Sequence, residues 1–166
     1  MTRKTRIRAA LVTATALVTA ATVTAGISAA GAGTSPKKPT EKQIAALFDG
    51  WNAALRTGDP EVVADRYAKD AVLLPTVSNK VRTDHAGIVD YFEHFLLNKP
   101  VGQKVRTIVN VLDSDSAIDT GVYEFTLTDP KTQQKRVVEA RYTYEYEKRG
   151  GTWLIVNHHS SAMPEG

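Results

Sequence analysis

The clearest pattern in the chain is an alternation of large and polar side chains near its C-terminal end. Three tyrosines, Tyr142, Tyr144 and Tyr146, alternate with charged or hydroxyl-bearing residues, which is the period of two of a strand with two different faces. The segment Arg149-Gly150-Gly151 then supplies a turn, because glycine accepts positive φ without steric cost. An apolar run follows over 153–156. A β-hairpin is therefore predicted over residues 141–165.

Upstream of residue 100 the apolar residues repeat with helical spacing instead. Thr40 and Gln43 have the form of a capping box, and an apolar face follows as far as Leu55. Gly58 ends this helix, and Asp59-Pro60 begins a second one, predicted over 61–67. A third helix, capped by Thr83, is predicted to run to about residue 97.

The remaining elements are predicted to be strands, over 71–74, 104–111, 117–128, 136–148 and 152–161. Short turns join the last four, which favours antiparallel pairing. Gly121 lies inside a strand and predicts a bulge or a sharp bend there. The predicted fold class is α+β: three N-terminal helices packed on a strongly bent antiparallel sheet, forming a cone with an internal pocket.

The first 32 residues are predicted to be a signal peptide. Four basic residues precede an Ala/Thr/Val/Leu segment, and Ala30-Gly31-Ala32 is typical of a cleavage site. Residues 33–39 form a polar tether, and 40–166 form a single folded domain. We expect the mature protein to be secreted, starting near Gly33, with no membrane attachment after cleavage.

Removing the signal peptide changes the charge argument. It takes four of the 21 Lys and Arg residues, leaving 17 against 18 Asp and Glu. A nearly neutral domain gives no reason to expect a nucleic acid partner. The chain has no cysteine, which excludes disulfides, thiolate zinc sites and cysteine catalysis. No metal-ligand cluster, phosphate loop or dinucleotide motif is present, so no metal and no cofactor is expected.

The polar end of the last strand is the candidate site. His158 and His159 are neighbours on a strand and must point to opposite faces, so only one can enter a pocket. Asp119 shares its side of an apolar strand with Tyr123, and an acid there needs a partner or a proton. Asp119 is interpreted either as a structural pair with Arg141 or as an acid/base group with a raised pKa. If Asp119 pairs with Arg141, the removal of Asp119 would leave a buried cation unpaired.

Several motifs carry a resemblance to a known family: WNAALRTGDP, DYFEHFL, ARYTYEYE and GTWLIVNHHSSAMPE. From about residue 42 to 165 the chain resembles the association domain of calcium/calmodulin-dependent protein kinase II, and more broadly the nuclear-transport-factor-2-like (NTF2-like) cone fold. The resemblance implies self-association through the open sheet face. It implies neither kinase activity nor calmodulin binding, because the kinase motifs are absent from this sequence.

The resemblance also bears on the site. The family keeps a histidine at the position of His159, so His159 is predicted to be the inward one. Arginines that line the kinase cavity are replaced here by Tyr123, Tyr144 and Ser160. Arg106 and Arg141 are then the nearby candidates to supply positive charge.

Two function hypotheses follow. The first is a secreted, self-associating domain that binds a small molecule or a partner in its cone, as a homodimer through the sheet or as part of a larger ring. The outer sheet face would expose alternate Val, Ile and Tyr side chains, and His159→Ala would weaken ligand binding. The alternative is a cofactor-free isomerase, dehydratase or cyclase with Asp119, Tyr123 and His159 as acid/base groups. The predicted ligand-binding residues are Tyr91, Arg106, Arg141, Tyr144, Trp153, Asn157 and Ser161.

Overall fold

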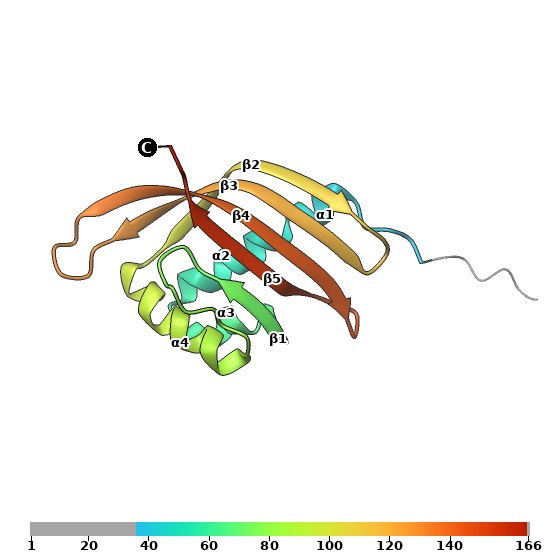
Figure 1. Ribbon diagram of the computed structural model, residues 1–166, viewed down its shortest axis with the longest axis horizontal. Coiled ribbons are helices and arrows are strands. Elements are labelled where there is room, and N and C mark those ends of the chain that lie inside the picture. Colours follow the sequence, from blue (N-terminus) through green and yellow to red (C-terminus); the bar gives the residue numbers. More distant parts are fainter. Residues whose placement is uncertain (1–35, 166) are drawn as a thin grey trace, which may run out of the picture. The chain divides into compact units, whose positions relative to one another are not determined.

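A computed structural model of the chain describes residues 36–165, and these residues have the predicted α+β architecture (Figure 1). The predicted signal peptide and residues 33–35 of the tether lie outside the described residues. The elements are α1 (Glu41–Ala45), α2 (Leu47–Thr57), α3 (Pro60–Ala64), β1 (Tyr67–Leu74), α4 (His85–Phe95), the 3-10 turn η1 (Leu96–Asn98), β2 (Val101–Val111), β3 (Ser116–Thr128), β4 (Lys135–Arg149) and β5 (Thr152–Ala162).

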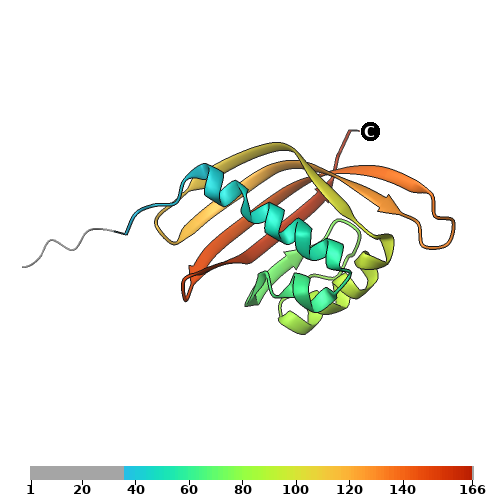
Figure 2. The ribbon, with the colours of Figure 1, turned by 180° about the vertical axis from the view of Figure 1, so that it is seen from behind.

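The helices begin where local capping chemistry allows. The predicted capping box is confirmed: the Gln43 N–H donates to Thr40 Oγ1 at 3.2 Å, and the Thr40 N–H donates to Gln43 Oε1 at 2.8 Å. Figure 2 shows α1 and α2 following one another as a rod across one face of the sheet. The buried side of this rod carries Ile44, Phe48, Trp51 and Leu55.

Two helix boundaries differ from the prediction. The second helix ends at Ala64, and Tyr67 instead begins β1, where it pairs with Ile155 of β5. The cap of α4 is Asp84 rather than Thr83, since Asp84 Oδ1 accepts the Gly87 N–H at 2.7 Å. Tyr67 joins β1 because its pairing with β5 prevails over the helical spacing of the apolar residues. Asp84 caps α4 because its carboxylate is better placed than the Thr83 hydroxyl.

The sheet has the strand order β1-β5-β4-β3-β2. The three pairs from β2 to β5 are antiparallel, as predicted, and Gly150 and Gly151 have the positive φ values that the β4–β5 turn requires. The expectation of an entirely antiparallel sheet was wrong, because β1 pairs with β5 in parallel. No short turn joins these two strands, so turn geometry does not fix their relative direction.

Two irregularities in the ladders decide which side chains face inward. Along β2 the register shifts at Val105, close to Gly121 of β3. A Cβ atom at position 121 would lie only 1.9 Å from the Arg106 carbonyl oxygen. The bulge predicted from Gly121 is therefore confirmed, on the adjoining strand. Along β5 the register shifts at Val156, between Ile155 and Asn157. A one-residue bulge reverses the alternation of faces beyond it.

The helices cover the inner face of the sheet, and the outer face is left open by the described residues (Figures 1 and 2). The expectation that tyrosines alternate with Val and Ile on the outer face was wrong for β4, because Tyr142, Tyr144 and Tyr146 lie inside and are at most 3% exposed. Exposed or half-buried aliphatic residues occupy the outer face instead, among them Val105, Ile108, Ile118, Val122, Leu154 and Val156.

Candidate ligand cavity

A mostly apolar cavity lies inside the domain, between α4, the inner sheet face and the β1–α4 loop (residues 75–84). Its volume is about 50 Å³, room for a few water molecules and well below the few hundred Å³ of an occupied small-molecule pocket. Aromatic rings form a large part of its wall. The lining residues are Trp51, Leu73, Pro75, Thr76, Val77, Tyr91, Phe92, Phe95, Tyr123, Phe125, Leu127, Val138, Ala140, His158 and Ser160.

The polar end of the cavity is built from hydroxyl groups and one imidazole. Tyr123 donates its hydroxyl hydrogen to Ser160 Oγ at 2.5 Å, and Ser160 Oγ also hydrogen-bonds Thr76 Oγ1. Burial raises the pKa of Tyr123 above its ordinary value, so this phenol stays neutral. The Thr76–Ser160 bond ties the β1–α4 loop to β5 and closes the cavity on that side.

His158 is the histidine that faces inward. The bulge at Val156 places it opposite Tyr144 of β4, and only 4% of its surface is exposed. Its Nδ1 atom lies 2.8 Å from the Tyr67 hydroxyl, whose oxygen accepts the Trp51 indole N–H at 3.0 Å. Burial, with a smaller contribution from neighbouring His159, lowers the pKa of His158 to about 3. The ring is therefore neutral at physiological pH.

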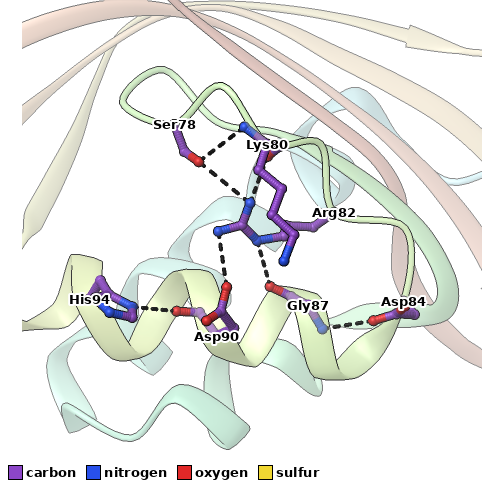
Figure 3. A network of polar contacts seen from close by, with 7 residues as sticks. All are labelled: Ser78, Lys80, Arg82, Asp84, Gly87, Asp90 and His94. Carbon is purple, nitrogen blue, oxygen red and sulfur yellow. Dashed lines mark hydrogen bonds and ion pairs between the residues drawn. The ribbon is translucent and has the colours of Figure 1, made fainter.

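The β1–α4 loop is fixed at its far end by Arg82, which is 7% exposed (Figure 3). Its guanidinium donates to the Gly87 carbonyl at 3.0 Å and the Lys80 carbonyl at 2.8 Å, and pairs with Asp90 at 3.0 Å. The Arg82 backbone also pairs with Leu73 of β1. Arg82 thus fastens the loop to α4, and residues 74–81 extend from that anchor to the cavity wall.

Asp119 does not line the cavity. It is fully buried on the inner face, where its Oδ1 accepts the Tyr142 hydroxyl at 3.0 Å and its Oδ2 has no partner among the described residues. Burial raises its pKa to about 6, against smaller opposing effects of the Tyr142 hydrogen bond and Lys104. The predicted Asp119–Arg141 pair was wrong, because Arg141 is opposite Val122 and its side chain is exposed on the outer face.

Four predicted site residues lie together, but on the opposite side of the sheet. Arg106, Arg141, His159 and Ser161 line an open groove of about 510 Å³ on the outer face, which we call the outer groove. The Arg141 Nε–H donates to Ser161 Oγ at 3.2 Å. Within residues 36–165 neither arginine has an acidic partner within ion-pair distance. The prediction that His159 points inward was therefore wrong.

The other predicted ligand-binding residues are spread over the domain. Tyr91 and Tyr123 line the cavity, whereas Tyr144 lies behind it and stacks on His158 with ring centroids 4.1 Å apart. Trp153 lies near Lys148 at the β4–β5 turn, and Asn157 lies beside the bulge without lining the cavity. The acid/base set of Asp119, Tyr123 and His159 is thus not assembled at one place.

Residues 36–165 lack two further features. No group of three or more His, Cys, Asp or Glu side chains is arranged to hold a metal ion. None of the described helices combines the length and the apolar character needed to span a membrane.

Comparison with protein families identifies the domain. The profile of the calcium/calmodulin dependent protein kinase II association domain matches residues 40–164. The chain belongs to this association-domain family. The predicted resemblance is thereby confirmed over nearly the whole described domain.

A solved structure from Xanthomonas campestris, described as a candidate association domain of this family, shares 59% sequence identity with the chain. The match covers 80% of this chain and 94% of that one, with a TM-score of 0.76. Curated proteins gave no significant match.

More distant structures confirm the NTF2-like fold of this association domain. An NTF2-like superfamily protein from Salmonella enterica has 14% identity and a TM-score of 0.63, covering 76% of this chain and 96% of its own. A ketosteroid isomerase-like protein from Erwinia carotovora has 15% identity and a TM-score of 0.62, covering 74% and 95%. At these identities the likeness concerns the fold alone.

Sequence reasoning missed several residues of the association domain's cavity. His158 was assigned to the wrong face, and the contributions of Trp51, Tyr67 and Thr76 were not foreseen. One signal was available in the sequence: if the alternating tyrosines of β4 are interpreted as buried, they identify the inner face of that strand. The bulge at Val156 has no comparable mark, because no glycine or proline stands there.

Proposed function

We propose that this protein is an exported association domain that pairs with itself through its outer sheet face and binds a small, mostly apolar molecule in its internal cavity. The observation that carries the binding proposal is the cavity itself: an aromatic wall, a small polar end and a loop that covers it. Pockets of this make-up are typical of small-molecule sites.

Ligand entry requires the β1–α4 loop to move, because about 50 Å³ is too little space for an organic molecule. A shallow surface groove lies outside the loop and shares Val77, Tyr91 and Phe95 with the cavity. Val77 is 68% exposed, so displacing it costs little buried apolar surface. The groove is the natural approach to the cavity, and breaking the Thr76–Ser160 hydrogen bond opens it.

Self-association rests on the family and on the outer face. The related kinase domain is named for association. In this chain the outer face carries aliphatic side chains next to two arginines without acidic partners among the described residues. A contiguous patch of this kind is uncommon on monomers. Export rests on the sequence of residues 1–32 alone.

An enzymatic role receives less support. Asp119 has the raised pKa of a candidate acid/base group, and a ketosteroid isomerase-like protein shares the fold. General acid/base catalysis needs the group within hydrogen-bond reach of a bound substrate. Because Asp119 does not line the cavity and His159 lies outside it, binding is proposed rather than catalysis.

The binding proposal is tested by titrating the ¹⁵N-labelled mature chain with acetophenone. We expect resonances of cavity-lining residues to shift, and the cavity-filling variant Ala140→Leu to abolish these shifts. Ala140 is buried and lines the cavity, so a larger side chain there takes the space that a ligand needs. Shifts confined to the outer face, or undiminished in Ala140→Leu, would reject the cavity as the binding site.

A further inference from the structure

The hydrogen atoms around His158 are fixed by a chain of donors. The Trp51 indole nitrogen has one hydrogen and no acceptor capacity, so it donates to the Tyr67 oxygen at 3.0 Å. The Tyr67 hydroxyl has no other acceptor among the described residues, so it donates its own hydrogen to His158 Nδ1, 2.8 Å away. His158 Nδ1 therefore accepts, and in a neutral ring the hydrogen must then reside on Nε2.

The Nε2–H group of His158 is left without a partner. Among the described residues His158 Nε2 is a buried polar atom with no hydrogen bond, and His158 is part of the cavity lining. Tyr144 stacks on its ring and Trp51 packs edge-on at 5.6 Å, so the imidazole has little freedom to turn toward another acceptor. A buried donor without an acceptor is energetically costly, and a ligand that supplies the acceptor relieves this cost.

The charge of the lining restricts the ligand further. Within residues 36–165 no lysine or arginine lines the cavity, and the ring of His158 carries no charge there. A carboxylate entering this wall would lose its hydration without gaining a cation. The hydroxyls of Tyr123, Ser160 and Thr76 already bond one another, whereas the imidazole N–H of His158 is a buried group of the lining with no partner among the described residues.

We propose that the cavity selects uncharged molecules that combine an apolar body with one carbonyl-type acceptor, which receives the hydrogen of His158 Nε2, and that it discriminates against carboxylates. This inference names the ligand class of the site and rests on the proposed function.

Three probes of matched size test this. Acetophenone carries a ketone, α-methylstyrene replaces the ketone oxygen by a methylene group, and benzoate carries a carboxylate. We expect acetophenone to bind five- to tenfold more tightly than α-methylstyrene, the ratio that one hydrogen bond provides, and at least tenfold more tightly than benzoate at pH 7. Dissociation constants are measured by NMR titration of the mature chain.

Two measurements assign the preference to His158. The ¹⁵N spectrum of its imidazole should show a neutral ring protonated at Nε2, without any variant. Tyr67→Phe removes the donor that fixes the tautomer, and His158→Phe removes the N–H itself. Both should reduce the preference for acetophenone over α-methylstyrene to about one, and Tyr67→Phe retains the histidine if His158→Phe fails to fold.

The outcomes separate the two proposals. Equal affinity for acetophenone and α-methylstyrene, tighter binding of benzoate, or a ring protonated at Nδ1 would overturn the role of His158 while leaving the cavity a binding site. Failure of all three probes to bind would overturn the cavity itself as a ligand site, and the inference with it.

Discussion

Asp119 is a buried acid whose proton is held more tightly in the folded protein than in the unfolded chain. Its pKa rises to about 6 on folding, mainly through desolvation. The unfolded chain loses this proton near pH 4, so the contribution of Asp119 to stability is complete below that pH and is lost as the pH rises to about 6. The loss amounts to about 3 kcal/mol.

Asp119→Asn should therefore stabilise the protein at neutral pH. The amide mimics the protonated acid and still accepts the Tyr142 hydroxyl, so we expect a gain of about 2 kcal/mol at pH 7 and almost none at pH 4. Urea unfolding at the two pH values measures this difference. A variant less stable than the parent at pH 7 would show that the charged carboxylate is needed.

His158 has the opposite pH dependence. Its pKa falls to about 3, so the unfolded chain binds a proton below about pH 6.5 that the folded protein does not, and stability decreases on acidification. Between pH 6 and pH 4 the two groups nearly cancel in the parent. In Asp119→Asn the His158 contribution remains, and the stability should fall by about 1.4 kcal/mol more per pH unit than in the parent.

Asp119 and His158 also show which parts of the site could not be predicted from the sequence. The alternation on β3 correctly placed Asp119 and Tyr123 on the buried face. The predicted pair of Asp119 with Arg141 does not form, because Arg141 alternates with the buried tyrosines of β4 and therefore faces outward. His158 was missed because a single inserted residue in β5 reverses the faces, and the free energy that selects such a bulge comes from packing between strands rather than from local residue types.

At the level of elements, Asn52 joins α2 to the start of β2. Its Nδ2 donates to the Gly102 carbonyl at 2.7 Å and its Oδ1 accepts the Gly102 N–H at 2.9 Å. Asn52 is 5% exposed, so the Asn52→Ala variant leaves two buried backbone groups unpaired. We expect a loss of about 2 to 3 kcal/mol in thermal or urea unfolding, whereas the exposed Asn79→Ala should change stability by less than about 0.5 kcal/mol.

Arg82 anchors the β1–α4 loop to α4. Arg82→Lys keeps the charge but loses the planar fork that reaches the loop and α4 at once. Because its partner Asp90 is half exposed, we expect a moderate loss of about 2 kcal/mol. Hydrogen exchange at residues 76–81 should become faster, while exchange in β3 and β4 should keep its order of protection.

A control for this variant is Lys80→Ala, because Lys80 contributes only its backbone carbonyl to Arg82. Its loop exchange should match that of the parent. Unchanged loop exchange in Arg82→Lys would show that the Leu73–Arg82 backbone pairing suffices to hold the loop.

Two helix starts, the last turn and the order of the strands along the chain could be predicted from the sequence because they depend on local chemistry. The signals are a capping box at Thr40, Asp59-Pro60 before α3, and the glycine pair after β4. The position of β1 beside β5 could not be predicted. That pairing joins segments far apart in the chain, and only the burial of Leu73 and Ile155 in a common core selects it.

At the scale of the whole molecule, the outer face of β4 is suited to pairing with a second copy. This central strand presents Arg141, Thr143 and Glu145 outward in sequence. Two sheets packed face to face about a two-fold axis near Thr143 would bring Arg141 of each copy toward Glu145 of the other. Such an arrangement gives Arg141 an acidic partner, which it lacks among residues 36–165 of a single copy.

We predict that Arg141→Glu and Glu145→Arg each weaken self-association at least tenfold, and that the double variant restores it. Light scattering of the mature chain over a range of micromolar concentrations measures the change. A parent that is monomeric throughout this range would refute the association proposal, and single variants that assemble like the parent would place the contact elsewhere.

The parallel pairing of β1 with β5 has a consequence for how the protein reaches its fold. When a chain emerges progressively from a ribosome or a translocation pore, β1 has no strand beside it until β5 has followed, after α4 and three long strands. Contacts between such distant segments slow folding, since a large loop must close before they form. Until then an aliphatic strand edge at Val72 and Leu74 stays exposed, and such an edge promotes aggregation with other incompletely folded chains. Completion of the last strand is thus the step that both closes the sheet and covers this edge.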